Sequence, residues 1–503
     1  MPRLTLTQSV LALALAASPL SAQSWSTEPD IVPARWNMDA TAVGGRALFA
    51  GGGTNTTLYD TVDTYDPSSG AWTQMTLSSA RVFMAAVTLG DEALFAGGYG
   101  GPMFLASTVV DIYDANADSW STASLSEARY GMAATTVGGY ALFAGGVPVQ
   151  FGTPDQSDRV DVYEAATDDW TQTSLSVARQ ELAATSVGPY ALFAGGKGSG
   201  GHTDVVDVYD SSIGSPTNPA AWSQVALSQA RYQLTAVSDG TRAYFASGQI
   251  NMAGIPVDVT TVDIYDSSVG PPSNPAAWSV EQLSVPRRSM AAVAQGGRVL
   301  FAGGAYSFFD PTMGFMNFDH DSVDVFDPAT GTWSVEQLSL ARNSLAVADL
   351  GDRAVFAGGA TPNDGTPAPW DSGAVDVRVL GQWVDHGKAL PPMTGSAPEL
   401  GGAGNLAAGG ALTLTLTDAA PASPAWLVLG VNELCVPFKG GTLVPSPDLL
   451  LPLTTGSAGE FNLPTTWPAG VPAGLSVYLQ AWIPSAAGPS GFVASNGLEG
   501  ITE

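Results

Sequence analysis

Cysteine is almost absent from this chain. Its 503 residues include one, Cys435, so no disulfide can form within the chain. A hydrophobic content of 45% is enough to supply a core instead. Histidine and lysine are also scarce, at three each: His202, His320, His386, Lys197, Lys388 and Lys439. This inventory leaves little for catalysis by imidazole or thiol groups.

Positive charge is scarce as well. The chain has 18 Lys and Arg against 46 Asp and Glu, which gives a formal net charge of −28. Nucleic acids and anionic membranes bind clustered Lys and Arg, so this balance repels both. We expect no nucleic-acid partner and no membrane insertion. A solvated surface outside the cell explains the acidity, and a cation-binding surface is the alternative.

The chain has one short apolar run, at its N-terminus, and no long one after it. Arg3 precedes the apolar stretch 10–17, Pro19 breaks it, and small residues around Ala22 allow cleavage before Trp25. The run is too short to span a bilayer. We therefore expect residues 1–24 to be a signal peptide, and the mature protein to be secreted or held at the surface of a bacterial cell.

Familiar catalytic motifs are missing too. The sequence contains no G-x-S-x-G elbow and no H-E-x-x-H. The cluster Asp319-His320-Asp321 lacks the ligand spacing of a known metal site. We therefore expect no catalytic residues, no metal and no cofactor.

What the chain has is a segment of about 50 residues that occurs seven times. It opens with Arg, continues into F-A-G-G, then V-D-x-Y-D, and closes with Trp. The Arg residues are Arg35, Arg81, Arg129, Arg179, Arg231, Arg287 and Arg342. The Trp residues are Trp72, Trp120, Trp170, Trp222, Trp278, Trp333 and Trp383. Such a period indicates a repeat architecture.

Each copy contains four strand-like pieces. In the second copy they are 84–89, 93–96, 109–113 and the residues around Trp120, joined by short turns such as Gly90-Asp91. No helical periodicity lies between them, so each copy predicts a four-stranded antiparallel meander. Small Ala residues fill the first piece and large aromatic residues the last two. This gradient fits a wedge, and wedges that close around an axis form a propeller.

The ordered set of Arg, Gly-Gly, V-D-x-Y-D and Trp resembles kelch repeats over Arg35–Trp383. Departures are few: Ser247 replaces the first Gly in the fifth copy, Phe326 replaces Tyr in the sixth, and the seventh reads Val375-Asp376-Val377-Arg378. The resemblance implies an all-β fold with a seven-bladed β-propeller, over residues 25–390. Kelch-like copper oxidases need a Tyr–Cys crosslink. Because Cys435 lies beyond the repeats, the resemblance does not extend to that chemistry.

Two segments compete for the outer strand of the last blade. Trp383 follows the seventh copy, whereas Trp25 precedes the first Arg in a segment resembling Trp72–Arg81. We slightly favour Trp383. Trp25 would instead close the ring from the N-terminal side.

The period stops near Leu390. Residues 391–402 are rich in Pro, Gly and Ser and predict a linker. Residues 403–503 contain short strand-like runs separated by Pro and Gly, which predict a small C-terminal β-sandwich. Its ending, Ser495–Glu499, resembles that of a tail module found on secreted bacterial proteins.

Each repeated Arg is matched by an Asp of the third piece. A charge that occurs once per blade favours architecture over a site, so we expect buried structural pairs. The residues concerned are Arg81, Asp111, Arg129, Asp161, Arg179, Asp207, Arg231 and Asp263. The alternative is that some of the Arg residues line a binding mouth.

Function is expected where the copies differ. The residue after each Arg varies, and in a propeller these positions surround one channel mouth. The candidate ligand-binding residues there are Trp36, Tyr130, Gln180, Tyr232, Arg288 and Asn343. They suit a polar ligand with apolar faces, such as a sugar or a peptide loop. The alternative, which we favour, is that they only plug the channel.

The loop of residues 305–321 in the sixth copy is long and aromatic. It carries Phe308, Phe309, Phe315 and Phe318. We favour a lid or plug over the propeller face, and the alternative is an aromatic contact for a partner.

The leading hypothesis is a monomeric, non-catalytic binding scaffold for a protein or glycan partner. One alternative is a carbohydrate-active propeller of the epimerase or mutarotase type, which needs only Arg and carboxylates at the mouth. The other is a cell-surface protein that attaches through its C-terminal domain.

Overall fold

The computed structural model describes residues 25–502 with gaps at 102–104, 149–155, 253, 311–313, 329, 362–369, 380–382, 394–395, 405, 407–408 and 468–474. The expected signal peptide, residues 1–24, lies outside the described residues. The chain divides into two compact units, one of which is Ser26–Val377 and the other of which contains Arg378–Glu503. This division falls earlier than the end of the propeller expected at residue 390.

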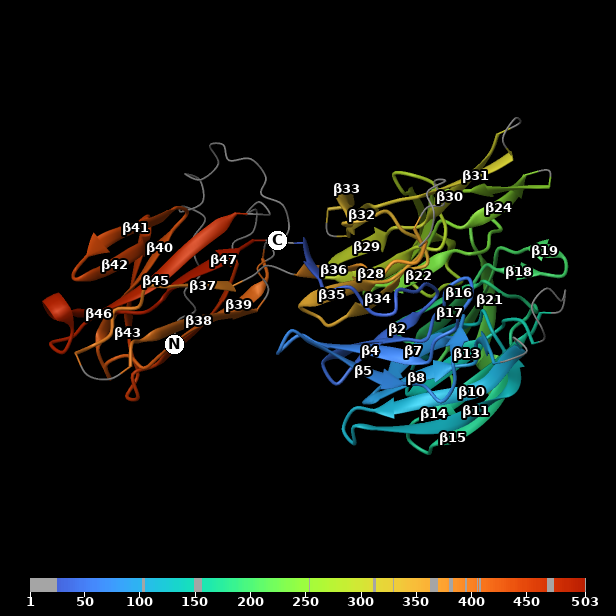
Figure 1. The fold of residues 1–503 in the computed structure, drawn as a ribbon, viewed down its shortest axis with the longest axis horizontal. Coiled ribbons are helices and arrows are strands. Elements are labelled where there is room, and N and C mark those ends of the chain that lie inside the picture. The colour runs from blue at the N-terminus through green and yellow to red at the C-terminus, as the bar shows by residue number, and fades with distance from the viewer. Residues whose placement is uncertain are drawn as a thin grey trace. The chain divides into compact units, whose positions relative to one another are not determined.

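Seven antiparallel sheets, each with a meander of four strands, make up the first unit (Figure 1). Each sheet, or blade, is given from its first strand outward. The first is β2 (Asp39–Val43), β3 (Arg46–Ala50), β4 (Thr61–Asp66) and β5 (Ala71–Thr76), and the second is β7 (Ala85–Leu89), β8 (Glu92–Ala96), β10 (Leu105–Asp114) and β11 (Ser119–Arg129). The third is β12 (Ala133–Val137), β13 (Tyr140–Ala144), β14 (Arg159–Glu164) and β15 (Asp169–Ser174), and the fourth is β16 (Ala183–Val187), β17 (Tyr190–Ala194), β20 (Val205–Asp210) and β21 (Trp222–Ala226). The fifth is β22 (Thr235–Ser238), β23 (Arg242–Ala246), β26 (Thr261–Asp266) and β27 (Trp278–Gln282), and the sixth is β28 (Ala291–Gln295), β29 (Arg298–Ala302), β32 (Ser322–Asp327) and β33 (Thr332–Gln337). The seventh is β34 (Ala346–Asp349), β35 (Arg353–Ala357), β36 (Val375–Val379) and β1 (Trp25–Glu28).

The first strands of these sheets contact one another in a closed circuit, in the order β2, β7, β12, β16, β22, β28, β34 and back to β2. Their small side chains, such as Ala85 and Ala133, permit this approach. The sheets therefore surround a common axis, and the ribbon passes from blue to orange around it (Figure 1). The unit is a β-propeller.

Each hydrophobic core lies between two neighbouring blades. Leu94 and Val110 of the second blade pack with Phe143 and Tyr163 of the third, and all four are buried. Trp170 covers this cluster from the outer strand, 6.0 Å from the ring of Phe143 and 5.2 Å from that of Tyr163. The repeated Phe, Tyr and Trp thus form the large face of one wedge, which packs on the aliphatic face of the preceding wedge.

The outer strand of the last blade comes from the N-terminal side. β1 pairs with β36, and Figure 1 shows the blue strand beside the orange one. Trp383 instead lies in β37 (Trp383–Gly387), which pairs with a strand near the C-terminus. The preference for Trp383 as the closing residue is therefore wrong. The segment at Trp25 has the same Trp-to-Arg spacing as the other blades, within one residue, and sequence similarity alone did not rank the two.

The Gly-Gly doublets join the blades at the backbone. Gly98 donates its N–H to the carbonyl of Arg129 in the next blade, at 2.9 Å. A Cβ on Gly97 would lie 2.5 Å from the same carbonyl, and Gly97 has φ +64°, so a side chain is disfavoured for two reasons. In the fifth blade, Ser247 adopts φ 62°. Its hydroxyl offsets the strain by donating to the carbonyl of Val259 at 2.8 Å and contacting that of Arg287.

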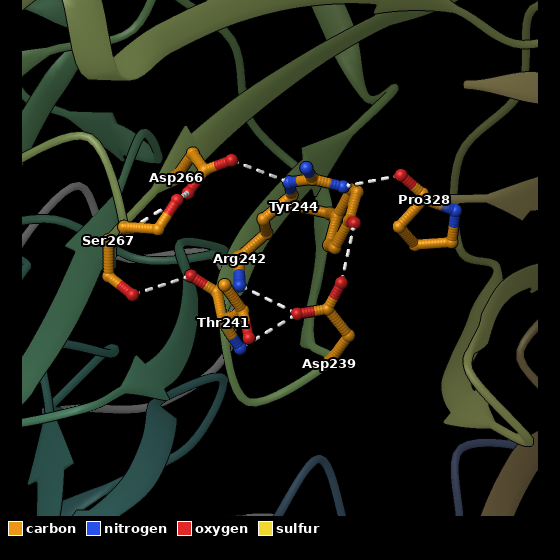
Figure 2. Close-up of polar contacts among 8 residues, drawn as sticks. Asp239, Thr241, Arg242, Tyr244, Asp266, Ser267 and Pro328 are labelled. Atoms are coloured by element: carbon orange, nitrogen blue, oxygen red, sulfur yellow. Dashed lines mark hydrogen bonds and ion pairs between the residues drawn. The ribbon is translucent and has the colours of Figure 1, made fainter. Parts of the chain in front are cut away.

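Polar contacts also link the blades at the turns between their first and second strands (Figure 2). Arg242 donates to Asp266 of its own blade at 2.7 Å and to the carbonyl of Pro328 in the next blade at 3.0 Å. Tyr244 donates its hydroxyl to Asp239 at 2.8 Å. The carboxylate of Asp239 also accepts the N–H groups of Thr241 and Arg242, at 2.8 and 2.6 Å. The turn is therefore rigid, and it carries the guanidinium to the neighbouring blade.

Within the described residues, three blades carry an extra hairpin between their second and third strands. The hairpins are β18 (Lys197–Gly198) with β19 (Gly201–His202), β24 (Gln249–Met252) with β25 (Ile255–Asp258), and β30 (Ala305–Asp310) with β31 (Gly314–Asp319). In the second blade, β6 (Arg81–Val82) and β9 (Tyr99–Gly100) extend the sheet instead. Single turns of 3-10 helix, η2 (Pro219–Ala221) and η3 (Pro275–Ala277), precede two outer strands.

Two sheets share one hydrophobic core in the second unit. One contains β37, β47 (Gly497–Ile501), β45 (Ser476–Pro484), β40 (Pro424–Gly430), β43 (Leu449–Thr454) and β46 (Phe492–Ala494), and the other β38 (Glu399–Gly404), β39 (Ala411–Thr417) and β44 (Phe461–Thr466). Leu412 and Leu414 of the second sheet pack with Leu427 and Ile483 of the first. A hairpin of β41 (Glu433–Phe438) and β42 (Gly441–Pro445) and the turn η4 (Pro489–Gly491) complete the unit. No helix in the described part of the chain is long and apolar enough to cross a membrane.

Candidate functional site: the loop face of the propeller

Every repeated Arg forms a buried ion pair with the Asp of its own blade. The N–O distances are 2.5 Å for Arg35–Asp63, 2.8 Å for Arg179–Asp207, 2.6 Å for Arg231–Asp263 and 2.7 Å for Arg342–Asp376, and Arg81–Asp111, Arg129–Asp161 and Arg287–Asp324 pair in the same way. The seven guanidinium groups are at most 1% exposed. No ligand can reach groups buried to this extent, so the pairs hold the blades together.

The Asp carboxylates of these pairs also accept a hydrogen bond from the backbone of the connection between two blades. Asp161 accepts the N–H of Ser126 at 2.9 Å, and Asp263 accepts that of Ser228 at 2.8 Å. Each Ser lies three residues before the Arg that pairs with the same Asp, in the connection between two blades. One Asp therefore holds both the Ser and the Arg of that connection. Burial lowers the pKa of the Arg287 guanidinium to about 10, while Asp324 opposes the shift. Arg287 therefore stays charged at neutral pH.

The six candidate mouth residues do not form one site. Each begins a short pairing with the residue that follows the Gly-Gly doublet of its blade, as Tyr232 does with Gln249. Tyr130 is buried, with its ring 5.4 Å from that of Tyr99. Arg288 donates to Asp258 and to Ser307, both at 2.8 Å. Gln180 pairs through its backbone with Lys197. These three residues support the loops.

The remaining three candidates border two cavities. Tyr232 lines the larger one, which lies between the fourth and fifth blades. Trp36 and Asn343 line a smaller one between the first and seventh blades. The two cavities lie at non-adjacent pairs of blades, so residues that share a sequence position serve different places on the face.

The larger cavity measures about 710 Å³ and is open to solvent. Its walls are the hairpins β18–β19 and β24–β25 and the connection that ends at Tyr232. The lining residues are Lys197, Gly200, Gly201, His202, Gln229, Ala230, Tyr232, Ile250, Asn251 and Pro256. Amides, a hydroxyl and one cation thus converge beside aliphatic and aromatic surface, which is the composition of a ligand site.

Tyr232 is held rigidly in this cavity. The ring of His202 stacks on it with centroids 4.3 Å apart and 22° between the planes, and the ammonium of Lys197 lies 5.6 Å from its centroid. Its hydroxyl donates to Gln249 at 2.5 Å. Burial raises the pKa of Tyr232 and Glu181 adds to the shift, so the phenol stays neutral. Burial and Lys197 lower the pKa of His202, which is neutral at pH 7 and stacks without a charge.

A circle of equivalent backbone positions, which the sequence did not reveal, lies one residue after the candidate position in each copy. The second residue after each Arg has a left-handed φ between 51° and 64°: Asn37, Phe83, Gly131, Glu181, Gln233, Ser289 and Ser344. Five N–H groups donate to the carbonyl of the equivalent residue in the preceding blade, at 3.0 to 3.3 Å. These residues therefore encircle the axis at this face, one position after the six candidates. Their types vary too much to signal the conformation.

Glu181 is the titratable member of this circle. Gln233 donates its amide N–H to the carboxylate of Glu181 at 3.1 Å. Burial raises the pKa of Glu181, while Gln233, Lys197 and Arg288 oppose the rise. Among the described residues, no group of three or more His, Cys, Asp or Glu is arranged to hold a metal ion.

The aromatic loop of the sixth blade is the hairpin β30–β31. The rings of Phe308 and Phe318 stack with centroids 5.8 Å apart and are 39% and 45% exposed. Tyr306 stacks on Phe308 at 6.1 Å. Both rings are therefore open to contact by a partner, and the expectation of a lid or plug stays a prediction. The side chains of Phe309 and Phe315 lie outside the described part of the structure.

Comparison with known proteins adds little. No family model matches this chain, and no curated protein matches it. Among solved structures, one titled "Structure of YjhT" is 13% identical, with a TM-score of 0.42, and the match covers 69% of this chain and 95% of that chain. A likeness at this level carries no argument about function.

Proposed function

We propose that this protein is a secreted, kelch-type propeller that binds a protein or glycan partner in the cavity around Tyr232 and does not transform it. The cavity carries the proposal. It is large enough for a small polar ligand or the tip of a loop, and rigid hairpins of two blades form its walls.

The lining chemistry supports binding without turnover. Among the residues that border the cavity, none is Asp or Glu, so the paired carboxylates of a sugar hydrolase are not in place there. Arg288, the Arg that a mutarotase-like activity would use at the mouth, is held there by Asp258 and Ser307. These contacts favour a binding role over the carbohydrate-active alternative.

The hairpins beside the cavity extend the contact surface. β25 contacts β30, so the exposed side chains of Ile255, Phe308 and Phe318 belong to adjoining hairpins. Exposed aromatic side chains often anchor partners. A ligand in the Tyr232 cavity can therefore continue onto this aromatic hairpin.

Arrays of glycans and peptides, probed with residues 25–503, test the proposal. We expect binding that weakens at least about tenfold in Tyr232→Ala, because the platform ring is lost. Lys197→Ala should weaken binding of an anionic ligand more than of a neutral one. Ile213→Ala is the matched control, since Ile213 is 53% exposed in the turn at the opposite end of the fourth blade.

The same samples can contradict the proposal. Product formation from any bound sugar, measured by NMR and lost in Arg288→Lys, would establish the enzyme alternative instead. Equal binding by the parent chain and Tyr232→Ala would place the ligand elsewhere on the molecule.

The second unit offers one observation in favour of surface attachment. All six residues of β41 are exposed, including Leu434, Val436 and Phe438 at 41 to 43%. Exposed apolar side chains of this kind mark contact surfaces when they gather. The full chain should then sediment with cell envelopes, and replacing all three side chains by Ser should release it.

A further inference from the structure

A smaller cavity lies between the first and seventh blades, where the ring closes. It measures about 260 Å³ and is lined by Trp36, Asn55, Asn343, Ser344, Ala360, Thr361 and Trp370. The lining contains two indoles, two carboxamides and two hydroxyls. No charged side chain is among them.

Trp36 is fixed in place by its backbone and by its ring. Its backbone N–H and carbonyl exchange hydrogen bonds with Gly53, both at 3.0 Å. Its side chain also lies beside Asp371: burial raises the pKa of this carboxylate, and Trp36 lowers it in part. The position of Trp36 is therefore set before any ligand arrives.

The carboxamide of Asn343 is also oriented. Asn343 donates to Asp319 at 2.9 Å, and its oxygen accepts the hydroxyl of Ser344 at 2.7 Å. Asp319 and Ser344 each occupy one hydrogen-bonding position of the Asn343 amide. A second N–H and a second lone pair of this amide therefore remain. Asn55 is exposed on a turn in which Thr54 accepts the N–H groups of Thr56 and Thr57, at 3.3 and 3.1 Å.

This combination selects for one ligand chemistry. An indole offers a broad apolar face, which suits the C–H surface of a sugar ring. Carboxamides donate and accept at once, as hydroxyl groups require. A volume of about 260 Å³ leaves room for one sugar ring.

We propose that this cavity is a second binding site, independent of the Tyr232 cavity, and that it takes a single neutral pyranose ring. Trp36 and Trp370 supply the apolar platform. Asn55 and Asn343 bind the ring hydroxyls. None of the lining residues that the structure describes is charged, which suits a neutral sugar.

Fluorine NMR of the full chain labelled with 5-fluorotryptophan tests this site. The resonances of Trp36 and Trp370 are assigned from Trp36→Phe and Trp370→Phe. Methyl β-D-glucopyranoside, methyl β-D-galactopyranoside and N-acetyl-D-glucosamine are then added separately to about 20 mM, which covers dissociation constants in the low millimolar range. We expect saturable shifts of both resonances with at least one sugar.

Two variants separate this site from the first. Asn55→Ala, at an exposed position that leaves the fold intact, should weaken the shifts at least about fivefold, for the loss of one or two hydrogen bonds. Tyr232→Ala should leave them unchanged, so failure of the first site does not mimic failure of the second. Unmoved Trp36 and Trp370 resonances with all three sugars would overturn the proposal, as would equal shifts in Asn55→Ala.

Discussion

Gly359 donates its backbone N–H to the carbonyl oxygen of Arg35, across 3.0 Å. The two residues belong to the last and the first copies of the repeat. The same bond links each earlier doublet to the next Arg, as from Gly98 to Arg129 at 2.9 Å. The ring is therefore closed by the contact that joins its successive blades, and β1 adds the outer strand that the last copy lacks.

Removing β1 should weaken the propeller at this closure. A chain that begins at Pro29 leaves β36 without its outer neighbour, so its hydrogen-bonding edge is exposed. We expect a Tm lower by about 5 °C or more than that of a chain beginning at Trp25, measured by circular dichroism. Equal Tm values for the two chains would show that β1 contributes nothing to closure.

The buried Arg–Asp pairs should be costly to break one partner at a time. Arg179 and Asp207 are 0% and 3% exposed, so either single change strands a buried charge. We expect Arg179→Leu and Asp207→Leu each to cost about 3–5 kcal/mol, and the double variant to cost less than their sum. Urea denaturation of the three variants measures this coupling.

An exposed pair provides the comparison. Arg46 and Asp118 lie 3.8 Å apart with side chains 44% and 72% exposed. Arg46→Ala should therefore cost less than about 1 kcal/mol. A loss as large as that of Arg179→Leu would contradict the distinction between buried and exposed pairs.

The pairs and the four-stranded meander could be predicted because the sequence repeats them. A residue type that returns at one position in seven copies, such as the Asp of the third strand, indicates a constant environment. Chain closure could not be ranked in this way. Trp25 and Trp383 both follow the pattern of an outer strand, and only the pairing of β1 with β36 decides between them.

The binding face was harder to predict, for a physical reason. Phe83, Glu181 and Gln233 adopt left-handed φ values of 54°, although L-residues of these types rarely do. The hydrogen bonds between neighbouring blades impose this conformation, and side-chain type does not report it. The cavities follow from hairpins of unequal length, whose spatial overlap has no counterpart in the sequence. Tyr232 was nevertheless named as a candidate from its variable position alone, and its role in binding stays a prediction.

The Gly-Gly doublet should tolerate a methyl group less well than a turn does. A Cβ on Gly98 would lie 2.7 Å from the Met84 side chain and 2.9 Å from the Val82 carbonyl, whereas one on Gly139 meets nothing within 4 Å. Both have positive φ, so both variants carry strain of about 1–2 kcal/mol. Gly98→Ala should cost at least about 1 kcal/mol more from overpacking. Equal shifts of the denaturation midpoint would refute the steric argument.

Asp39 should make the propeller less stable as the pH rises. It occupies the position held by Ala in five other copies, at Ala85, Ala133, Ala183, Ala291 and Ala346. Burial raises its pKa to about 7, against opposing contributions from the Met84 N–H and Arg81. The folded state binds the proton more tightly than the unfolded chain, so this contribution is fully present below about pH 4 and lost as the pH rises through 7.

Asp39→Ala should therefore raise the Tm at pH 8 and change it little at pH 4. We expect a gain of about 2 kcal/mol at pH 8, after allowing for the partial exposure of the side chain. Asp66→Ala is a control of opposite sign, since hydrogen bonds from Ser68 lower the pKa of Asp66. That variant should lose stability at pH 8. Asp39 would have an ordinary pKa if its variant changed the Tm equally at both pH values.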